Sequence, residues 1–400
     1  MHQPPFSTLR LGLAPMEGVS ELPLRLWMSQ TSAPDFMSTP FLRATATYPR
    51  VLPLDFAPEL TFLRPWVTYP LIPQVMTGQA DEFLRAAELF LEDGAPWVDL
   101  NAGCPSPNPI SGGAGSGLLR DPEILPNLLS RICAALPPHT VSLKMRTGFE
   151  DTRHFETSLD ALRHLPLKQL TLHGRTRRDR YDGHARWELM ARAAEVLPFP
   201  VVASGDIVSY ASLAERRKIF PEVRSAIIGR GALRNPWLFE ELRNTQASIL
   251  DRETLLSALA VLGLLFQAYR TAGQSLLNFV QTGIFLGRAG TSREAWEELY
   301  QASCRALLGA TVSYEDLAFD RQTMGRLKML YNSLRSSLPI PFREPTLMRV
   351  QSFGDWVQAW QNFGEECARF TIRHDPSQDW LYTSSRRQAA DSHTKEVCHD

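Results

Sequence analysis

The sequence predicts an α/β protein, a (β/α)8 TIM barrel followed by an all-helical C-terminal domain. Short apolar runs rich in β-branched residues recur about every 30 residues through the first 230 positions. Amphipathic stretches with helical spacing separate these runs. After Asn235 the apolar runs stop and helical patterns continue alone. Alternating strands and helices favour a parallel sheet covered on both faces, and eight such units fit a closed barrel.

The eight expected strands are centred near Leu11, Phe36, Ile72, Val98, Val141, Leu170, Val201 and Ile227. Helices are expected between them, among others over residues 80–92, 121–136 and 187–196. A doubly wound open sheet is the rival arrangement, but it normally has fewer strands and a glycine-rich first turn. The first turn here reads APMEG, which favours the barrel.

The C-terminal part of the chain reads as helices over residues 254–270, 293–308, 322–336 and 353–370. The longest apolar run, Leu255 to Phe266, has only twelve residues. A bilayer needs about 20, so we expect a buried helix there. The expected domains are a barrel at 1–245, a helical domain at 246–380 with an insertion at about 246–320, and a polar tail at 381–400.

Composition limits the functional classes. The 400 residues include 42 Lys and Arg against 43 Asp and Glu, which gives a net charge of -1. This balance excludes a uniformly basic nucleic-acid coat but leaves room for a local basic patch. The five cysteines show no zinc-ligand spacing, and their odd number and low density favour a reducing cytosol. The N-terminus lacks the pattern of a signal peptide. We therefore expect a cytoplasmic protein with no metal and no membrane contact.

Polar side chains follow seven of the eight expected strands, at the end where barrel enzymes carry their chemistry. These strand-end segments are Pro15-Met16-Glu17-Gly18, Gln74, Asn101-Ala102-Gly103-Cys104-Pro105, Lys144-Met145-Arg146, His173-Gly174-Arg175-Thr176, Ser204-Gly205-Asp206 and Gly229-Arg230-Gly231. A barrel end without a function would not need them. The sequence therefore predicts an active site at this end.

Several of these residues also have an ordinary structural interpretation. The turn at Gly229 and Arg230 follows strand 8, where barrels commonly bind phosphate, although it could be a simple connection. A buried lysine such as Lys144 is rare unless it is paired, which favours a role in function. His173 alone could be a core histidine, and Cys104 alone would more often be an inert buried thiol.

The strand ends together resemble the tRNA-dihydrouridine synthases. The segments that carry the resemblance are APMEG (14–18), Gln74, NAGCP (101–105), SLKMR (142–146), HGRTRRDRYDGHARW (173–187), SGD (204–206), IGRGALRNPW (228–237) and MGRLKMLYNSLR (324–335). The Glu in APMEG and the segment Phe41-Leu42-Arg43 resemble the C subtype, which acts on position 16 of the tRNA D-loop. Ser204 stands where the family usually has Asn.

The resemblance implies FMN as cofactor, NADPH as reductant and a tRNA uridine as substrate. The residues expected to hold the flavin are Pro15, Met16, Glu17, Gln74, Lys144, His173, Ser204, Gly205, Asp206, Gly229 and Arg230. Reduction of the uracil 5,6-double bond needs a hydride at carbon 6 and a proton at carbon 5. Cys104 is the expected proton donor, since an unperturbed thiol is mostly protonated at neutral pH.

The remaining expected sites contact tRNA. Asn101 and Arg146 are expected to fix the polar edge of the uracil, and Tyr181 to meet the flipped nucleotide. On the helical domain Arg321, Lys328 and Arg335 are spaced by seven and share one helix stripe. Further expected tRNA contacts are Arg43 and Arg326. We expect a monomer that binds the D-loop, although the stripe could also be an ordinary solvated face.

Two other functions stay open at this point. A flavin barrel oxidoreductase for a small molecule, such as a dihydroorotate-type or enoate reductase, would share the flavin but not need the helical domain. A non-catalytic RNA-binding relative would bind no flavin. The visible spectrum of the purified protein separates this last possibility from the other two.

Overall fold

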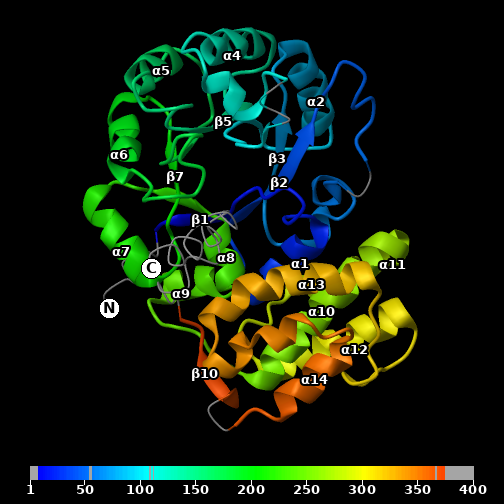
Figure 1. Ribbon diagram of the computed structural model, residues 1–400. Coiled ribbons are helices and arrows are strands. Elements are labelled where there is room, and N and C mark those ends of the chain that lie inside the picture. The colour runs from blue at the N-terminus through cyan, green and yellow to red at the C-terminus, as the bar shows by residue number, and fades with distance from the viewer. Residues whose placement is uncertain (1–7, 54–55, 108–109, 111, 365–366, 374–400) are drawn as a thin grey trace, which may run out of the picture.

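Eight parallel strands close into a barrel in the order β1 to β8 in the computed structural model, which describes residues 8–53, 56–107, 110, 112–364 and 367–373 (Figure 1). The strands are β1 (Arg10–Leu13), β2 (Phe36–Arg43), β3 (Leu71–Met76), β4 (Val98–Ala102), β5 (Val141–Arg146), β6 (Leu170–His173), β7 (Val201–Ser204) and β8 (Ser225–Ile228). Each of the eight expected centres lies inside its strand, so the predicted barrel is confirmed.

Helices cover the outside of the barrel between successive strands. They are α1 (Leu22–Thr31), α2 (Ala80–Glu92), α4 (Ile124–Ala135), α5 (Phe155–Leu162), α6 (Trp187–Val196), α7 (Tyr210–Ile219), α8 (Arg230–Arg234) and α9 (Leu238–Asn244). Helices α2 and α6 match the expected ranges, whereas α4 begins three residues later than expected. The reason is a local turn, in which the Asp121 carboxylate accepts the Glu123 N–H at 2.9 Å.

A small apolar cluster comes from strands around the barrel and is separate from the main core. It holds Phe36 together with Ile72, Val202 and Ile227, all buried. Gly12 of β1 makes room for the aromatic ring, because a Cβ there would lie 2.3 Å from Phe36 ring atoms. These side chains fill the barrel interior, as small barrels require.

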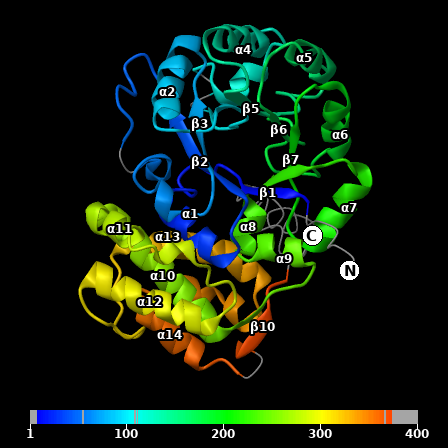
Figure 2. The ribbon, with the colours of Figure 1, turned by 180° about the vertical axis from the view of Figure 1, so that it is seen from behind.

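The C-terminal helices form a cluster beside the barrel, against α1 and α8 (Figures 1 and 2). They are α10 (Arg252–Thr271), α11 (Gly273–Val280), α12 (Arg293–Leu308), α13 (Arg321–Leu334) and α14 (Phe353–Gln361). The segment 246–320, expected as an insertion, supplies α10, α11 and α12. Helix α10 packs against α1, α12 and α13, so this segment is the centre of the helical region.

Three tryptophans join the helical region to the barrel. Trp27 of α1 donates its indole N–H to the Ala258 carbonyl at 2.7 Å and lies 6.3 Å from the Trp237 ring. The Trp296 ring lies 6.5 Å from Trp27, and its indole N–H reaches the Gly290 carbonyl at 3.0 Å. All three rings are buried. Such an apolar contact fixes the helical region firmly beside the barrel.

The helix expected over 353–370 is shorter than predicted. Helix α14 ends at Gln361, and the chain returns as strand β10 (Arg369–Thr371), which pairs antiparallel with β9 (Ile249–Asp251). The expectation was wrong because this pairing joins segments more than 100 residues apart, and local periodicity does not report such contacts. The pair ties the two ends of the helical region together. The tail at 381–400 lies outside the described residues.

Helix α10 is, within the described ranges, the one helix long and apolar enough to cross a membrane. Of its most apolar window, 78% is buried inside the protein. This burial identifies it as the core helix of the helical region, in agreement with the sequence prediction.

Candidate active site at the mouth of the barrel

Strand register brings the predicted residues side by side around the carboxyl end of the barrel. Asn101 of β4 is paired with Lys144 of β5, and Arg146 with His173 of β6. His173 is in turn paired with Ser204 of β7. Five of the strand-end residues therefore lie on four neighbouring strands, β4 to β7, at the same end of the barrel.

A buried polar chain links β3, β4 and β5 below this rim. The Gln74 side-chain N–H donates to the Asp99 carboxylate at 2.7 Å, and the Asn101 amide donates to the Gln74 oxygen at 2.7 Å. Ser142 donates to the second Asp99 oxygen. Burial raises the pKa of Asp99, which these hydrogen bonds oppose. Gln74, a predicted flavin ligand, keeps one amide N–H for such a contact.

Lys144 is a half-buried cation without a direct partner. Within the described residues its ammonium makes no hydrogen bond and no ion pair. Burial, helped by the nearby Arg146 charge, lowers the pKa of Lys144 to about 8, and Asp99 and Cys104 oppose this shift. Because unpaired buried ammonium groups are costly, this arrangement suits a ligand with negative charge or electron-rich atoms.

Cys104 follows β4 and carries a free, half-buried thiol. Asn101 fixes the start of its loop, since the amide oxygen accepts the backbone N–H groups of Gly103 at 3.0 Å and Cys104 at 2.9 Å. Asn101 thereby uses most of its hydrogen-bonding capacity inside the protein and keeps one amide N–H. The thiol lies close enough to Lys144 and Arg146 to affect the pKa of both.

Arg146 is buried and spends most of its guanidinium on backbone carbonyls. Its Nε donates to Gly103 at 2.9 Å, and its Nη1 donates to Thr176 at 2.8 Å and Arg180 at 2.7 Å. Burial lowers the pKa of Arg146 to about 10. Arg146 therefore joins the loop that carries Cys104 to the loop after β6. Only Nη2 stays available for the predicted contact with uracil.

His173 ends β6 and lies among four positively charged side chains. Burial first, and then the charges of Arg146, Lys144, Arg175 and Arg230, lower the pKa of His173 well below its usual value. The imidazole is therefore neutral at pH 7, and a neutral ring carries one donor and one acceptor nitrogen. This state suits hydrogen bonding to a polar ligand better than ion pairing.

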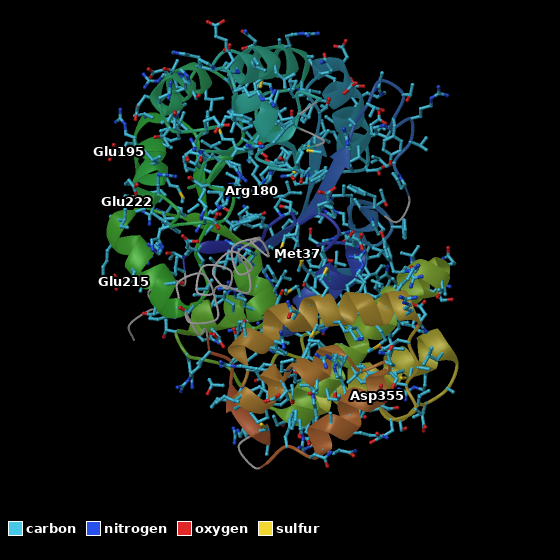
Figure 3. All side chains as sticks on the ribbon, in the orientation of Figure 1. Met37, Arg180, Glu195, Glu215, Glu222 and Asp355 are labelled. Carbon is cyan, nitrogen blue, oxygen red and sulfur yellow. The ribbon has the colours of Figure 1, made fainter. Side chains whose placement is uncertain are left out.

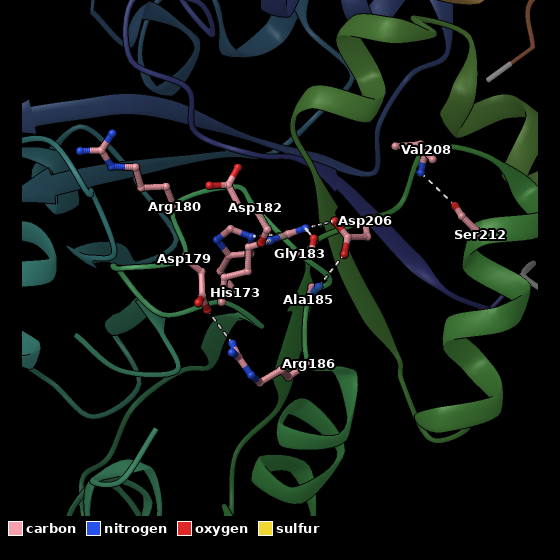
Figure 4. Close-up of polar contacts among 12 residues, drawn as sticks. His173, Asp179, Arg180, Asp182, Gly183, Ala185, Arg186, Asp206, Val208 and Ser212 are labelled. Atoms are coloured by element: carbon pink, nitrogen blue, oxygen red, sulfur yellow. Dashed lines mark hydrogen bonds and ion pairs between the residues drawn. The ribbon is translucent and has the colours of Figure 1, made fainter. Parts of the chain in front are cut away.

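Arg175 and Asp206 hold the loop after β6 against the end of β7. Asp206 and its neighbours Asp182, Gly183 and Ala185 are labelled in Figure 4. The Arg175 guanidinium donates to Asp206 at 2.7 Å and to the carbonyls of Asp182 and Gly183. The other Asp206 oxygen accepts the Ala185 N–H at 2.6 Å. Asp206, a predicted flavin ligand, is thus engaged with the protein itself.

Gly205 has a φ of +125°, a conformation that favours glycine. A Cβ there would lie 2.7 Å from the Ala185 Cβ and 3.2 Å from the His173 ring. The loop between β7 and α7 therefore approaches the end of β6 so closely that a side chain larger than that of glycine would not fit at position 205. Ser204, which precedes it, is buried at the rim.

Tyr181 lies between two arginines at the mouth. The guanidinium of Arg230 is 4.4 Å from the centre of its ring, and that of Arg146 is 5.5 Å away. The ring of His173 lies 6.4 Å from that of Tyr181. Tyr181 is 37% exposed, so the residue is partly accessible at the mouth. Arg180, next to it, lies inside the ring of helices, while Glu195, Glu215 and Glu222 mark the outer edge (Figure 3).

The ends of β1 and β8 complete the rim. Pro15 and Met16 are half-buried and Glu17 is exposed. The Met16 sulfur would lie 3.6 Å from a Cβ on Gly229, which precedes α8. Arg230 begins α8, and burial lowers its pKa. The two strand ends thus form adjoining walls of the mouth.

The predicted tRNA contacts lie in different environments. Arg43 is exposed at the end of β2 and Arg321 is exposed at the start of α13, while Lys328 is half-buried. Arg335 donates to the Arg343 carbonyl at 2.9 Å. Arg326 donates to the Gly18 carbonyl and to the Glu21 carboxylate of the barrel, so its guanidinium is already engaged.

A cavity of about 230 Å3 lies beside the mouth, between the loops that follow β4 and β5. Arg146 lines it, but Cys104, Lys144 and His173 do not. The chemically distinctive residues therefore define the candidate site better than this cavity does.

Sequence reasoning missed Asp99, and it named Arg175 among the strand ends without giving it a role of its own. Asp99 alternates with Asn101 inside an apolar strand, a period of two that places both side chains on one face. Arg175 is buried two residues after His173, and a buried arginine needs partners. The alternation of Asp99 with Asn101 was visible in the sequence, whereas the burial of Arg175 was not. No group of three or more His, Cys, Asp or Glu side chains in the described ranges could hold a metal ion.

Comparisons with known proteins give the family. The dihydrouridine synthase (Dus) family model matches residues 12–284. The tRNA-dihydrouridine synthase B of Pasteurella multocida is 30% identical over 250 residues, which cover 62% of this chain and 71% of that protein. The tRNA-dihydrouridine(16) synthase of Yersinia pestis is 34% identical over 236 residues, 57% of this chain and 74% of that protein.

Among solved structures, the old yellow enzyme homologue from Zymomonas mobilis is similar, with a TM-score of 0.42 and 13% identity over 59% of this chain and 88% of that chain. The family model reaches past the barrel into α10 and α11, while α12, α13 and α14 lie beyond its last matched residue. With its barrel, its strand-end residues and this match, the chain belongs to the dihydrouridine synthase family.

Proposed function

We propose that this protein is a flavin-dependent tRNA-dihydrouridine synthase, which reduces the 5,6-double bond of a D-loop uridine in tRNA. FMN is the cofactor, NADPH the electron source and Cys104 the proton donor. One observation carries the proposal: a cation without a partner, Lys144, and a free thiol, Cys104, share the barrel mouth with the amide of Asn101. We expect a monomer that acts in the cytoplasm, where tRNA is found.

The residues at the mouth fit a flavin. Lys144 lacks an internal partner, and the electron-rich pyrimidine end of a flavin would supply one. Gln74 keeps one amide N–H for the ring, and neutral His173 can donate or accept a hydrogen bond. Pro15 and Met16 offer half-buried apolar surface on the opposite wall. When bound, the flavin would supply the two electrons for uracil reduction and would be reduced again by NADPH.

The ribityl and phosphate end fits the loops after β7 and β8. Backbone N–H groups at Gly229 and the start of α8 suit an anion, and Arg230 brings a positive charge. Arg175 holds Asp206 in place, which fixes the adjoining Ser204-Gly205 turn. Serine is shorter than the asparagine usual at position 204, yet its hydroxyl still offers a donor and an acceptor.

Cys104 would deliver the proton to carbon 5 of the uracil. Transfer converts the S–H to a thiolate, while a new C–H bond forms at carbon 5. The neighbouring charges of Lys144 and Arg146 stabilise the thiolate that remains. Solvent then returns a proton to the sulfur, because the thiol is half-exposed.

The uracil and its nucleotide would be held by polar groups that make no hydrogen bond to the described part of the protein. Asn101 has one free amide N–H, and Arg146 has Nη2. Tyr181, partly exposed between two guanidinium groups, offers an aromatic face to a base that leaves its stack. The C-subtype features of the sequence favour position 16, and mapping of dihydrouridine in tRNA from cells with and without this gene tests that position.

The Cys104→Ala variant tests the proposed reaction. Reduction of uridine in tRNA should fall by about a hundred- to ten-thousand-fold, the usual contribution of a general acid. The rate of flavin reduction by NADPH, which is measured as the loss of the yellow absorbance, should equal that of wild type. Cys133→Ala removes another half-buried free thiol, on α4, and should leave both reactions intact.

Three outcomes would contradict the proposal. A colourless purified protein would exclude the flavin. A yellow protein that never changes uridine content in tRNA would be an oxidoreductase for another substrate. Uridine reduction by Cys104→Ala within a few-fold of wild type would remove the thiol as the acid.

A further inference from the structure

The backbone around Cys104 is held from three sides. The two backbone N–H groups of Gly103 and Cys104 both donate to Asn101 of β4. The Gly103 carbonyl accepts from Arg146 of β5 at 2.9 Å. The Cys104 carbonyl accepts two hydrogen bonds from Ser116, one from its backbone N–H at 3.0 Å and one from its hydroxyl at 2.8 Å. Every polar backbone group of residues 103 and 104 is therefore bonded.

The third support comes from the glycine-rich segment 112–117. It enters the short helix η3 (Gly115–Leu119), which packs against β4. Gly115 has a φ of +56°. A Cβ there would lie 3.1 Å from the Cys104 carbonyl oxygen and 3.2 Å from the Cys104 Cβ. Glycine at this position lets the segment lie directly on the cysteine.

Ser116 itself is fully buried. Its hydroxyl therefore reaches neither solvent nor a bound RNA, and among the described residues it donates to the Cys104 carbonyl alone. A hydroxyl placed in this way acts on the reaction only through the cysteine. By contrast, the thiol of Cys104 remains half-exposed at the mouth.

We propose that Ser116 is a positioning residue for Cys104, and that the segment 112–117 serves as a rigid brace for the proton donor. The Ser116 hydroxyl and N–H hold the carbonyl side of Cys104, while Asn101 and Arg146 hold its N–H side. With the peptide fixed at both ends, only the side-chain torsion of the cysteine stays free. The inference rests on the proposed role of Cys104 as the acid.

Ser116→Ala is the test variant, because it deletes the hydroxyl and keeps the backbone N–H bond. Ser303→Ala is the matched control: Ser303 is also fully buried, its hydroxyl also donates to a backbone carbonyl, and it lies in α12 of the helical region. Ser116→Thr retains the hydroxyl and serves as the rescue variant. Thermal unfolding of each purified holoenzyme confirms that it is folded.

Two measurements are needed. The first compares two rates in each variant, the reduction of uridine in tRNA and the reduction of the flavin by NADPH. Ser116→Ala should lower kcat for uridine by about tenfold or more, since small misplacements of a reacting group are expensive. KM for tRNA and flavin reduction should stay within twofold of wild type. Ser116→Thr should recover most of kcat, and Ser303→Ala should match wild type.

The second measurement does not depend on turnover. The rate at which iodoacetamide alkylates Cys104, followed by mass spectrometry of its peptide, should change several-fold in Ser116→Ala and not in Ser303→Ala. An unchanged alkylation rate, wild-type turnover, or an equal loss of both half-reactions would overturn the inference. An active Cys104→Ala enzyme would instead refute the acid role, while an altered alkylation rate would still show that Ser116 braces the cysteine.

Discussion

Arg326 of α13 donates to the carboxylate of Glu21, just before α1 of the barrel, at 2.8 Å. The same guanidinium donates to the Gly18 carbonyl and lies 5.6 Å from the Phe266 ring of α10. Gly18 follows Glu17, which the family resemblance predicts to lie beside the flavin. One arginine thus connects the helical region to a loop of the proposed active site.

This contact predicts a structural rather than an RNA-binding role for Arg326. Arg326→Ala should lower the free energy of unfolding by about 1–2 kcal/mol, because an ion pair and a backbone hydrogen bond are lost together. In a double-mutant cycle with Glu21→Gln, urea unfolding should report a coupling of about 0.2–1 kcal/mol, the range of partly exposed pairs. Strict additivity of the two changes would show that the pair does not stabilise the protein.

Lys328, two residues further along α13, is expected to behave differently. It is half-exposed, and among the described residues no ion pair holds its ammonium, so it is available to an RNA phosphate. Lys328→Ala should weaken tRNA binding and reduce the slope of log affinity against log salt by about one unit. Arg131→Ala, an exposed change on α4, and Arg326→Ala should leave that slope unaltered. A slope for Lys328→Ala equal to wild type would mean that this stripe only faces water.

Lys144 should destabilise the protein when no ligand is bound. Its pKa falls from 10.5 to about 8 in the folded state, a difference worth about 3 kcal/mol. Below about pH 8 the folded protein bears the full cost of the buried charge. Between about pH 8 and 10.5 the unfolded chain binds more protons at this site, so the contribution of Lys144 to stability rises with pH.

The Lys144→Met variant tests whether Lys144 destabilises the folded protein at neutral pH. In protein freed of bound flavin, the free energy of urea unfolding of this variant should exceed that of wild type at pH 7. The difference between the two free energies should become smaller by pH 10. The same variant should retain less flavin, because the unpaired cation is gone. A less stable variant at pH 7 would show that Lys144 has a partner inside the folded protein.

The barrel could be predicted because its signals are local. Short apolar runs and helical stretches repeat at regular spacing, and each expected strand centre lies inside the corresponding strand. The return of the chain at β10 could not be predicted, since Arg369 pairs with Asp251 across more than 100 residues. Similarly, α4 begins at Ile124 because of a side-chain turn that the apolar pattern does not record.

The same distinction holds for the site. Parallel strands bring their carboxyl ends together, so Asn101, Lys144 and His173 could be placed at one rim from the sequence. The internal partners of Arg146 could not, because they are backbone carbonyls in loops 30 or more residues away. Ser116 escaped notice for the same reason, as its partner is the carbonyl of Cys104. The role of a side chain depends on such contacts as much as on its position.

Tyr181 offers a last test, which separates ring stacking from hydrogen bonding. Its ring lies against Arg230 at 4.4 Å, and an aromatic face stabilised in this way suits a flipped base. Tyr181→Phe keeps the ring and should bind tRNA within a few-fold of wild type. Tyr181→Ala should lose about 1–3 kcal/mol of tRNA affinity, the usual worth of a stacked base, while NADPH still reduces the flavin. Equal loss in both variants would assign the contact to the hydroxyl, and wild-type affinity in Tyr181→Ala would exclude Tyr181 from the RNA interface.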